Sequence, residues 1–228
     1  MKGFVCHVSL CLLLFMGWQG SPLFAQTGEG VEVGISLSGI SYLGDFSETD
    51  AAFRRFHPGL DLALQQNHDR MLQFQFHGGF GKFADQFEGS WPQVAGVDPV
   101  NFVETTFFYG NLGLAFRPLA TKRIQPFVAI GAGLMYFVPR DQDGKQLPPR
   151  TQTRDETEAS YNRVIPQLPA TIGVMGRLNQ RIQLKLAYTF RFVPSDYLDN
   201  TGALGAREGF DSLHAILIGL HLNLRPEE

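Results

Sequence analysis

The chain has 228 residues, a length that suits one or two domains. With 44% hydrophobic and 18% charged residues, it does not have the composition of a disordered protein. Its formal net charge of −3 argues against a nucleic-acid binder that works through bulk positive charge. Glycine (25 residues) and phenylalanine (20 residues) are both abundant, which favours a β-sheet protein over a helical bundle.

The first 25 residues have the three parts of a secretory signal peptide. Lys2 supplies the positive start, residues 8–18 form the apolar run, and Ser21 to Ala25 provide a cleavage region. An uncleaved anchor helix is the alternative, although the apolar run is shorter than the ~20 residues that span a bilayer. Both cysteines, Cys6 and Cys11, lie in this signal, so we expect no disulfide or thiolate site after cleavage.

The rest of the chain consists of stretches of about ten residues in which apolar and polar side chains alternate. In residues 182–192, Ile, Leu, Tyr and Phe occupy every second position, with Gln, Lys, Ala, Thr and Arg between them. Such a period of two is typical of β-strands with one apolar face. Eight strands are predicted, at residues 31–43, 57–66, 71–83, 102–117, 126–138, 165–178, 182–193 and 212–224.

The connections between these strands alternate in length. Short connections cover residues 67–70, 118–125 and 179–181, and long ones cover 44–56, 84–101, 139–164 and 194–211. This pattern is typical of an up-and-down transmembrane barrel with short periplasmic turns and long extracellular loops. An even strand number places both termini in the periplasm. The loop over 139–164 has almost no apolar residue, so we expect it to stay solvated outside the cell.

Alternation alone does not show which face of the sheet meets water. A soluble barrel of the lipocalin type would bury the apolar face. Three features favour the membrane: small residues on the polar face, export, and aromatic residues at girdle depths on the apolar face (Phe108, Tyr136, Tyr188 and Phe192). We therefore predict that residues 26–228 form one all-β domain, an eight-stranded antiparallel up-and-down transmembrane β-barrel in an outer membrane.

Three segments share their pattern with a known family. Residues 32–45 end in Tyr-Leu-Gly-Asp, residues 125–133 read Gln-Pro-Phe-Val-Ala-Ile-Gly-Ala-Gly, and residues 191–199 contain Ser-Asp-Tyr-Leu-Asp. They resemble the first strand, the fifth strand and the Thr-Asp-Tyr-Leu-Asp segment of the small outer-membrane barrels that include PorG of the type IX secretion system, with Ser195 in place of Thr. The resemblance implies a non-catalytic barrel that anchors or docks an envelope or secretion complex.

Two other functions remain open. One is a stand-alone barrel that displays its loops for adhesion or envelope integrity, and the other is a lipid A-modifying hydrolase. The expected partners are outer-membrane lipid and periplasmic proteins of a secretion complex. We expect no cofactor, no nucleic acid and no small-molecule substrate.

Four acidic residues are expected near the outer mouth of the barrel. Asp45 closes the first strand, Asp196 and Asp199 follow the seventh, and Asp211 precedes the eighth. Because the eighth strand pairs with the first and the seventh in a closed barrel, all four carboxylates can meet at one side. A cluster of oxygen ligands suits calcium. The alternative is that these aspartates begin turns by binding their own backbone.

Ser212 and His214 are predicted to share one face of the last strand, near Glu208. A serine nucleophile needs an adjacent imidazole as base and a carboxylate that orients the imidazole. Small barrels that trim lipid A use a Ser-His-Glu set in such a place, but no oxyanion donor is identifiable here. Ordinary polar residues at the membrane interface are the alternative, and we expect no catalytic residue. The remaining histidines show no metal-ligand spacing, so we expect no histidine metal site.

The inward-facing residues predict a plugged lumen. Two acids, Glu32 and Asp61, face several basic side chains. Because an unpaired buried charge costs several kcal/mol, we expect Lys185 or Arg191 to pair with one of these acids. The two arginines nearest the turns have the alternative of reaching periplasmic water. The large inward side chains are Phe107, Tyr109, Arg117, Met135, Arg177, Lys185, Arg191 and His221.

Overall fold

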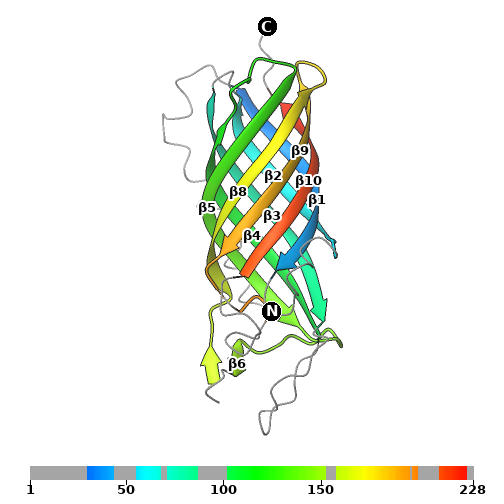
Figure 1. Cartoon of the computed structure of the whole chain (residues 1–228), viewed down its shortest axis with the longest axis vertical. Helices are drawn as coiled ribbons and strands as arrows, with labels where there is room; N and C mark the ends of the chain where they lie inside the picture. The colour runs from blue at the N-terminus through cyan, green and yellow to red at the C-terminus, as the bar shows by residue number, and fades with distance from the viewer. Residues whose placement is uncertain are drawn as a thin grey trace.

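The computed structural model describes residues 30–43, 55–67, 71–86, 102–152, 158–195, 197–199 and 211–224. Eight long strands in these residues close into one antiparallel barrel (Figure 1), which confirms the predicted fold. No helix in the described residues has the length and apolarity to cross a membrane. The strands are β1 (Gly30–Leu43), β2 (His57–Asn67), β3 (Leu72–Gln86), β4 (Phe102–Phe116), β5 (Ile124–Arg140), β8 (Val164–Arg177), β9 (Ile182–Val193) and β10 (Asp211–Asn223).

Pairing of the last strand with the first closes the sheet. Among these eight strands, those that follow one another along the chain are hydrogen-bonded neighbours in the barrel. The last strand, β10, pairs with β1 over twelve residue pairs, from Glu32↔Asn223 to Leu43↔Ser212. A closed sheet has no edge, so its backbone groups are satisfied within the wall, as a membrane requires.

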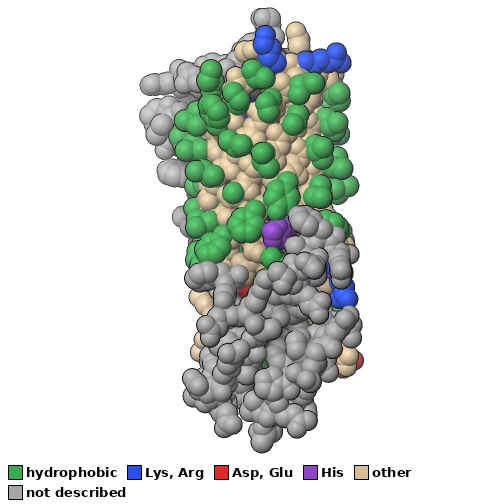
Figure 2. Space-filling view, viewed as in Figure 1, with side chains coloured by type: hydrophobic (Ala, Val, Ile, Leu, Met, Phe, Trp, Pro, Cys, Tyr) green, Lys and Arg blue, Asp and Glu red, His purple; other side chains and the backbone are tan. Residues whose placement is uncertain are grey.

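The outward face of the wall is apolar. Leu37, Leu112 and Ile130 on this face are 71%, 70% and 68% exposed. Figure 2 shows apolar side chains spread over the barrel wall, with lysine and arginine at its top and again lower on its right edge. The four predicted girdle residues also lie on the outward face: Phe108 is 52% exposed and the other three are half-buried. The lipocalin-type alternative, with its apolar face inside, is therefore not the arrangement adopted.

The observed strand bounds differ from the predicted ones by at most three residues, and the largest difference is at the outer end of β3. This strand was predicted to end at residue 83 but continues to Gln86, where it pairs with Phe102. Charged residues break the apolar alternation here, yet the ladder continues because β4 supplies its hydrogen bonds. Lys82 and Glu104, whose Nζ and Oε2 atoms lie 3.1 Å apart, join the two strands at this end.

The short connections 117–123 and 178–181 lie at the end of the barrel opposite to the described part of the third long connection (Figure 1). The connection between β2 and β3, residues 68–71, is also short. The start of β1 and the end of β10 both lie at this short-turn end, where the Leu224 amide donates to the Val31 carbonyl (3.0 Å). The predicted signal, residues 1–25, lies outside the described residues.

The third long loop is more ordered than its hydrophilic composition predicts. It contains a small hairpin of β6 (Arg150–Gln152) and β7 (Glu158–Ser160) at the end opposite the short turns. Tyr161, just after this hairpin, stacks on Phe137 (5.7 Å between ring centroids) and on Tyr197 (5.0 Å). Burial in this stack raises the pKa of Tyr161 to about 12. The expectation that the whole loop stays solvated is therefore wrong at this tyrosine, which is half-buried between the rings of Phe137 and Tyr197.

Candidate functional site

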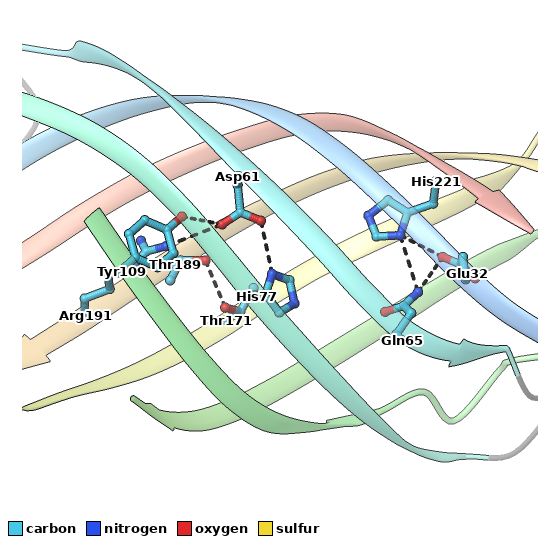
Figure 3. Close-up of polar contacts among 9 residues, drawn as sticks. All are labelled: Glu32, Asp61, Gln65, His77, Tyr109, Thr171, Thr189, Arg191 and His221. Carbon is cyan, nitrogen blue, oxygen red and sulfur yellow. Dashed lines mark hydrogen bonds and ion pairs between the residues drawn. The ribbon is translucent and has the colours of Figure 1, made fainter. Parts of the chain in front are cut away.

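The centre of the lumen contains an ion-pair cluster around Asp61 of β2 (Figure 3). This carboxylate is 1% exposed. Its Oδ1 atom lies 3.0 Å from His77 Nδ1, and its Oδ2 atom accepts a hydrogen bond from the Tyr109 hydroxyl and lies 3.5 Å from Arg191 Nη2. The Arg191 guanidinium also lies over the Tyr109 ring, 4.1 Å from its centroid. The structure thus brings together Arg191 and Asp61, one of the pairs expected from the sequence.

A second cluster surrounds Glu32 of β1, nearer the short-turn end (Figure 3). Glu32 is fully buried, and its Oε1 atom lies 2.7 Å from His221 Nδ1 on β10. Gln65 and Gln183 donate to the same carboxylate, Gln183 at 3.3 Å. No lysine or arginine lies within ion-pair distance of Glu32 among the described residues, so the expected pairing is made at Asp61 and not at Glu32.

The register of β1 and β10 explains why His221 is the partner of Glu32. Gly34 lies directly opposite His221, and a Cβ atom on Gly34 would meet the imidazole at 2.5 Å. The glycine leaves space for the ring, which then reaches the carboxylate two residues away on the same face. Strand pairing, together with the absence of a side chain at Gly34, is the signal that sequence reasoning missed.

Lys185 lies within ion-pair distance of neither acid among the described residues. Its side chain is 3% exposed, and its Nζ atom makes no hydrogen bond or ion pair within the part of the chain that the structure describes. Its nearest aromatic contact is the Phe127 ring, 5.8 Å from Nζ to the centroid.

Large side chains fill the rest of the lumen. Phe107 and Met135 are fully buried, as predicted from their inward positions. Arg177 reaches the short turn, where its Nη2 atom donates to the Ala120 carbonyl (3.2 Å). Arg117 is only 3% exposed, so the alternative that it reaches periplasmic water is wrong. Phe83 and Phe137 are also fully buried and add to the plug.

The outer mouth is bridged by two of the four predicted aspartates. The Tyr42 hydroxyl lies 3.0 Å from Asp199 Oδ2 and 2.5 Å from Asp211 Oδ1. Asp211 Oδ2 accepts from the Leu198 amide (3.0 Å), and the Thr105 hydroxyl donates to the Leu198 carbonyl (2.7 Å). These contacts hold Leu198, which is fully buried, across the mouth.

These contacts bear on both interpretations of the four aspartates, a calcium site and residues that begin turns. Asp45 and Asp196 lie outside the described residues, which contain no group of three or more potential metal ligands. The Asp211 carboxylate accepts a hydrogen bond from a backbone amide, as an aspartate that begins a turn would. The amide is that of Leu198, however, thirteen residues earlier in the chain and not in a turn begun by Asp211. Tyr42 and Thr105, which the sequence did not single out, complete the arrangement.

Ser212 and His214 meet on the outward face of the barrel. The Ser212 Oγ atom lies 3.4 Å from His214 Nε2, and the Tyr188 hydroxyl lies 2.6 Å from His214 Nδ1. Ser212 Oγ also lies within hydrogen-bond distance of the Leu43 carbonyl, at 3.4 Å. At Nδ1 the imidazole thus meets a phenol, which does not stabilise an imidazolium as a carboxylate does. Glu208, the acid predicted for this set, lies outside the described residues.

Comparison with known proteins supports the fold. No known protein family matches the chain, and no curated protein sequence matches it. The structure resembles Neisserial surface protein A, with a TM-score of 0.54 and 7% sequence identity over 85% of this chain and 97% of that one. The attachment invasion locus protein of Yersinia pestis gives a TM-score of 0.49 and 9% identity, over 87% of this chain and 100% of that one. OprG from Pseudomonas aeruginosa gives 0.47 and 12%, over 87% and 97%. The fold is that of a small outer-membrane barrel.

Proposed function

We propose that the chain is a non-catalytic outer-membrane barrel that anchors or docks an envelope complex through its ends rather than through its lumen. The observation that supports this proposal is the filled lumen. An eight-stranded barrel is only just wide enough for its own side chains. Here the described strands contribute Phe83, Phe107, Met135 and Phe137, all fully buried, beside two polar clusters. Single-channel recording of the purified protein should accordingly show no stable conductance.

An outer-membrane location with both termini of the chain in the periplasm is part of the proposal. The apolar outward wall, the predicted signal and the parity of the connections support it. Short turns then face the periplasm, and Lys122, Arg123 and Arg181 lie exposed on them. These three residues, which we call the basic rim, offer a positive surface to an acidic periplasmic partner.

A PorG-like role in a type IX secretion complex is the finer form of the proposal. Its support is the sequence resemblance and the way two of the three matching segments meet. Tyr42 belongs to the first segment and Asp199 to the third, and their side chains bind each other at the outer mouth. Two of the segments that carry the resemblance are therefore in contact at the outer mouth.

Cross-linking in intact cells, followed by purification of the full chain, tests the docking role. We expect periplasmic envelope proteins to co-purify with the wild type. Reversing the basic rim (Lys122→Glu, Arg123→Glu and Arg181→Glu) should abolish their capture, whereas Lys145→Glu at the opposite end should not. Capture that survives reversal of the rim would show that the partners dock elsewhere, and a wild type without partners would contradict the anchor function.

Loop display for adhesion is a second candidate, favoured by the stack of Phe137, Tyr161 and Tyr197. This stack fixes the base of the third loop against the barrel rim. Removing residues 141–163 should abolish binding of whole cells to a surface or host cell if the loop is the functional part. Docking of periplasmic proteins should persist in the same variant, so the two functions are separable.

We also propose that the Ser212–His214 pair is not catalytic. The 3.4 Å separation between Ser212 Oγ and His214 Nε2 supports this view. Ser212→Ala should leave the acylation of lipid A unchanged in cells that express the protein. A change in lipid A acyl chains that depends on Ser212 would contradict it.

A further inference from the structure

A small cavity lies inside the barrel beside the Asp61 cluster. Its volume is about 20 Å³, measured as the space open to the centre of a water-sized sphere. About 10–15 Å³ on this measure holds one water molecule. The cavity therefore has room for one occupant of about that size, and for no polyatomic ion such as sulfate.

The charges around this cavity do not balance among the described residues. Its lining contains one acidic side chain, Asp61, and three basic ones, His77, Lys185 and Arg191. Asp61 is already bound by Arg191, His77 and Tyr109 (Figure 3). Lys185 remains as a buried cation whose Nζ has no hydrogen-bond or ion-pair partner in the described chain. A buried charge without a counter-ion is energetically costly.

The other acid of the lumen is not within ion-pair distance of Lys185 among the described residues. Glu32 is bound by His221, Gln65 and Gln183, and it is not part of the cavity lining. The Phe127 ring, 5.8 Å from Nζ, supplies only a weak cation–π contact. A negatively charged occupant of the cavity would therefore balance the positive charge of Lys185.

Hydrogen-bond donors surround the same space. The Gln75 and Asn111 amides line the cavity and make no side-chain hydrogen bond to the described residues. The Thr171 and Thr189 hydroxyls share one hydrogen bond of 2.9 Å, which uses one of their two protons and leaves the other available (Figure 3). Arg191 has a buried Nε atom without a partner in the described chain.

We propose that this cavity binds one monatomic anion of halide size, with Lys185 as its counter-charge and the neighbouring amide and hydroxyl groups as hydrogen-bond donors. The anion completes the charge balance of the Asp61 cluster. This site is inside the wall and is independent of the docking function proposed above, which uses the barrel ends.

The test compares halides with an anion that is too large for the cavity. The full chain is refolded in detergent in sodium chloride, sodium bromide or sodium gluconate at equal ionic strength, so that the anion is present while the barrel closes. Because a ligand that binds only the folded state stabilises it, the unfolding temperature of the wild type should rise with halide concentration. Lys185→Met should lose this dependence, and Lys122→Met, at an exposed turn lysine, should keep it.

Crystals grown in bromide give a direct readout that needs no variant. An anomalous peak next to Lys185 Nζ is expected, and it decides the matter if Lys185→Met does not fold. A cavity that shows only water in bromide would overturn the proposal. Unfolding temperatures of the wild type that are equal in halide and gluconate would also overturn it.

Discussion

Replacing Asp61 with alanine removes the carboxylate that His77, Tyr109 and Arg191 share in the lumen. Asp61 and Arg191 are 1% and 4% exposed, so the guanidinium would be left as a buried charge without its counter-ion. Removing one partner of a buried ion pair costs ~3–5 kcal/mol. Arg191 would keep its stack on Tyr109, worth ~0.5–2 kcal/mol, so we expect the lower end of this range, about 3 kcal/mol.

Urea unfolding of the refolded barrel in lipid vesicles measures this loss, with the heat-dependent shift in gel mobility as a second readout. Insertion should persist, because the outward apolar face is unchanged. Asp143→Ala in the exposed third loop is the control and should change the unfolding free energy by less than ~0.5 kcal/mol. Adding Arg191→Met to Asp61→Ala should recover part of the loss, because the unpaired charge is then gone.

Two results would refute this reasoning. Asp61→Ala could be as stable as the wild type, which would mean that water compensates Arg191 fully. The double variant could instead lose the sum of the two single effects, which would mean that the two side chains are not coupled in the folded barrel.

Three further predictions follow from individual residues. Gly173→Ala should destabilise the barrel by ~1–3 kcal/mol, because the new Cβ would lie 2.6 Å from the Leu186 carbonyl oxygen. Gly176→Ala on the same strand should be nearly neutral, because nothing lies within 4 Å of its Cβ. Equal losses of the two variants in urea unfolding would contradict the packing argument. Trypsin added to intact cells should cut after the exposed Lys145 and spare the turn at 178–181; the reverse pattern would mean that the barrel is inverted. Burial raises the pKa of Tyr161 to about 12 from an ordinary value near 10, so its contribution to stability is complete below pH ~10 and is lost as the pH rises through about 12. An ultraviolet titration should lose one late-ionising tyrosine in Tyr161→Phe, and an unchanged titration would contradict this assignment.

The strands follow from local rules that can be read from the sequence. Lipid accepts only apolar side chains, whereas the lumen also accepts polar ones, so the alternation marks every membrane strand. The predicted bounds of all eight strands lie within three residues of the observed ones. The inward positions of Asp61 and Arg191 follow from this rule, and that of Phe107 follows from the period of two along its strand.

The partners in the lumen and at the mouth depended on the closed tertiary structure. Tyr42 and Asp211 are 169 residues apart in the sequence, and Glu32 and His221 are 189 apart. Each pair meets because β10 closes on β1 in one register, which local alternation does not encode. A side chain that faces inward has neighbours from several strands, and the register and the tilt of the strands decide which of them it reaches. For this reason the sequence could place Lys185 inside the lumen, but only the assembled barrel could place it beside a cavity and apart from both acids.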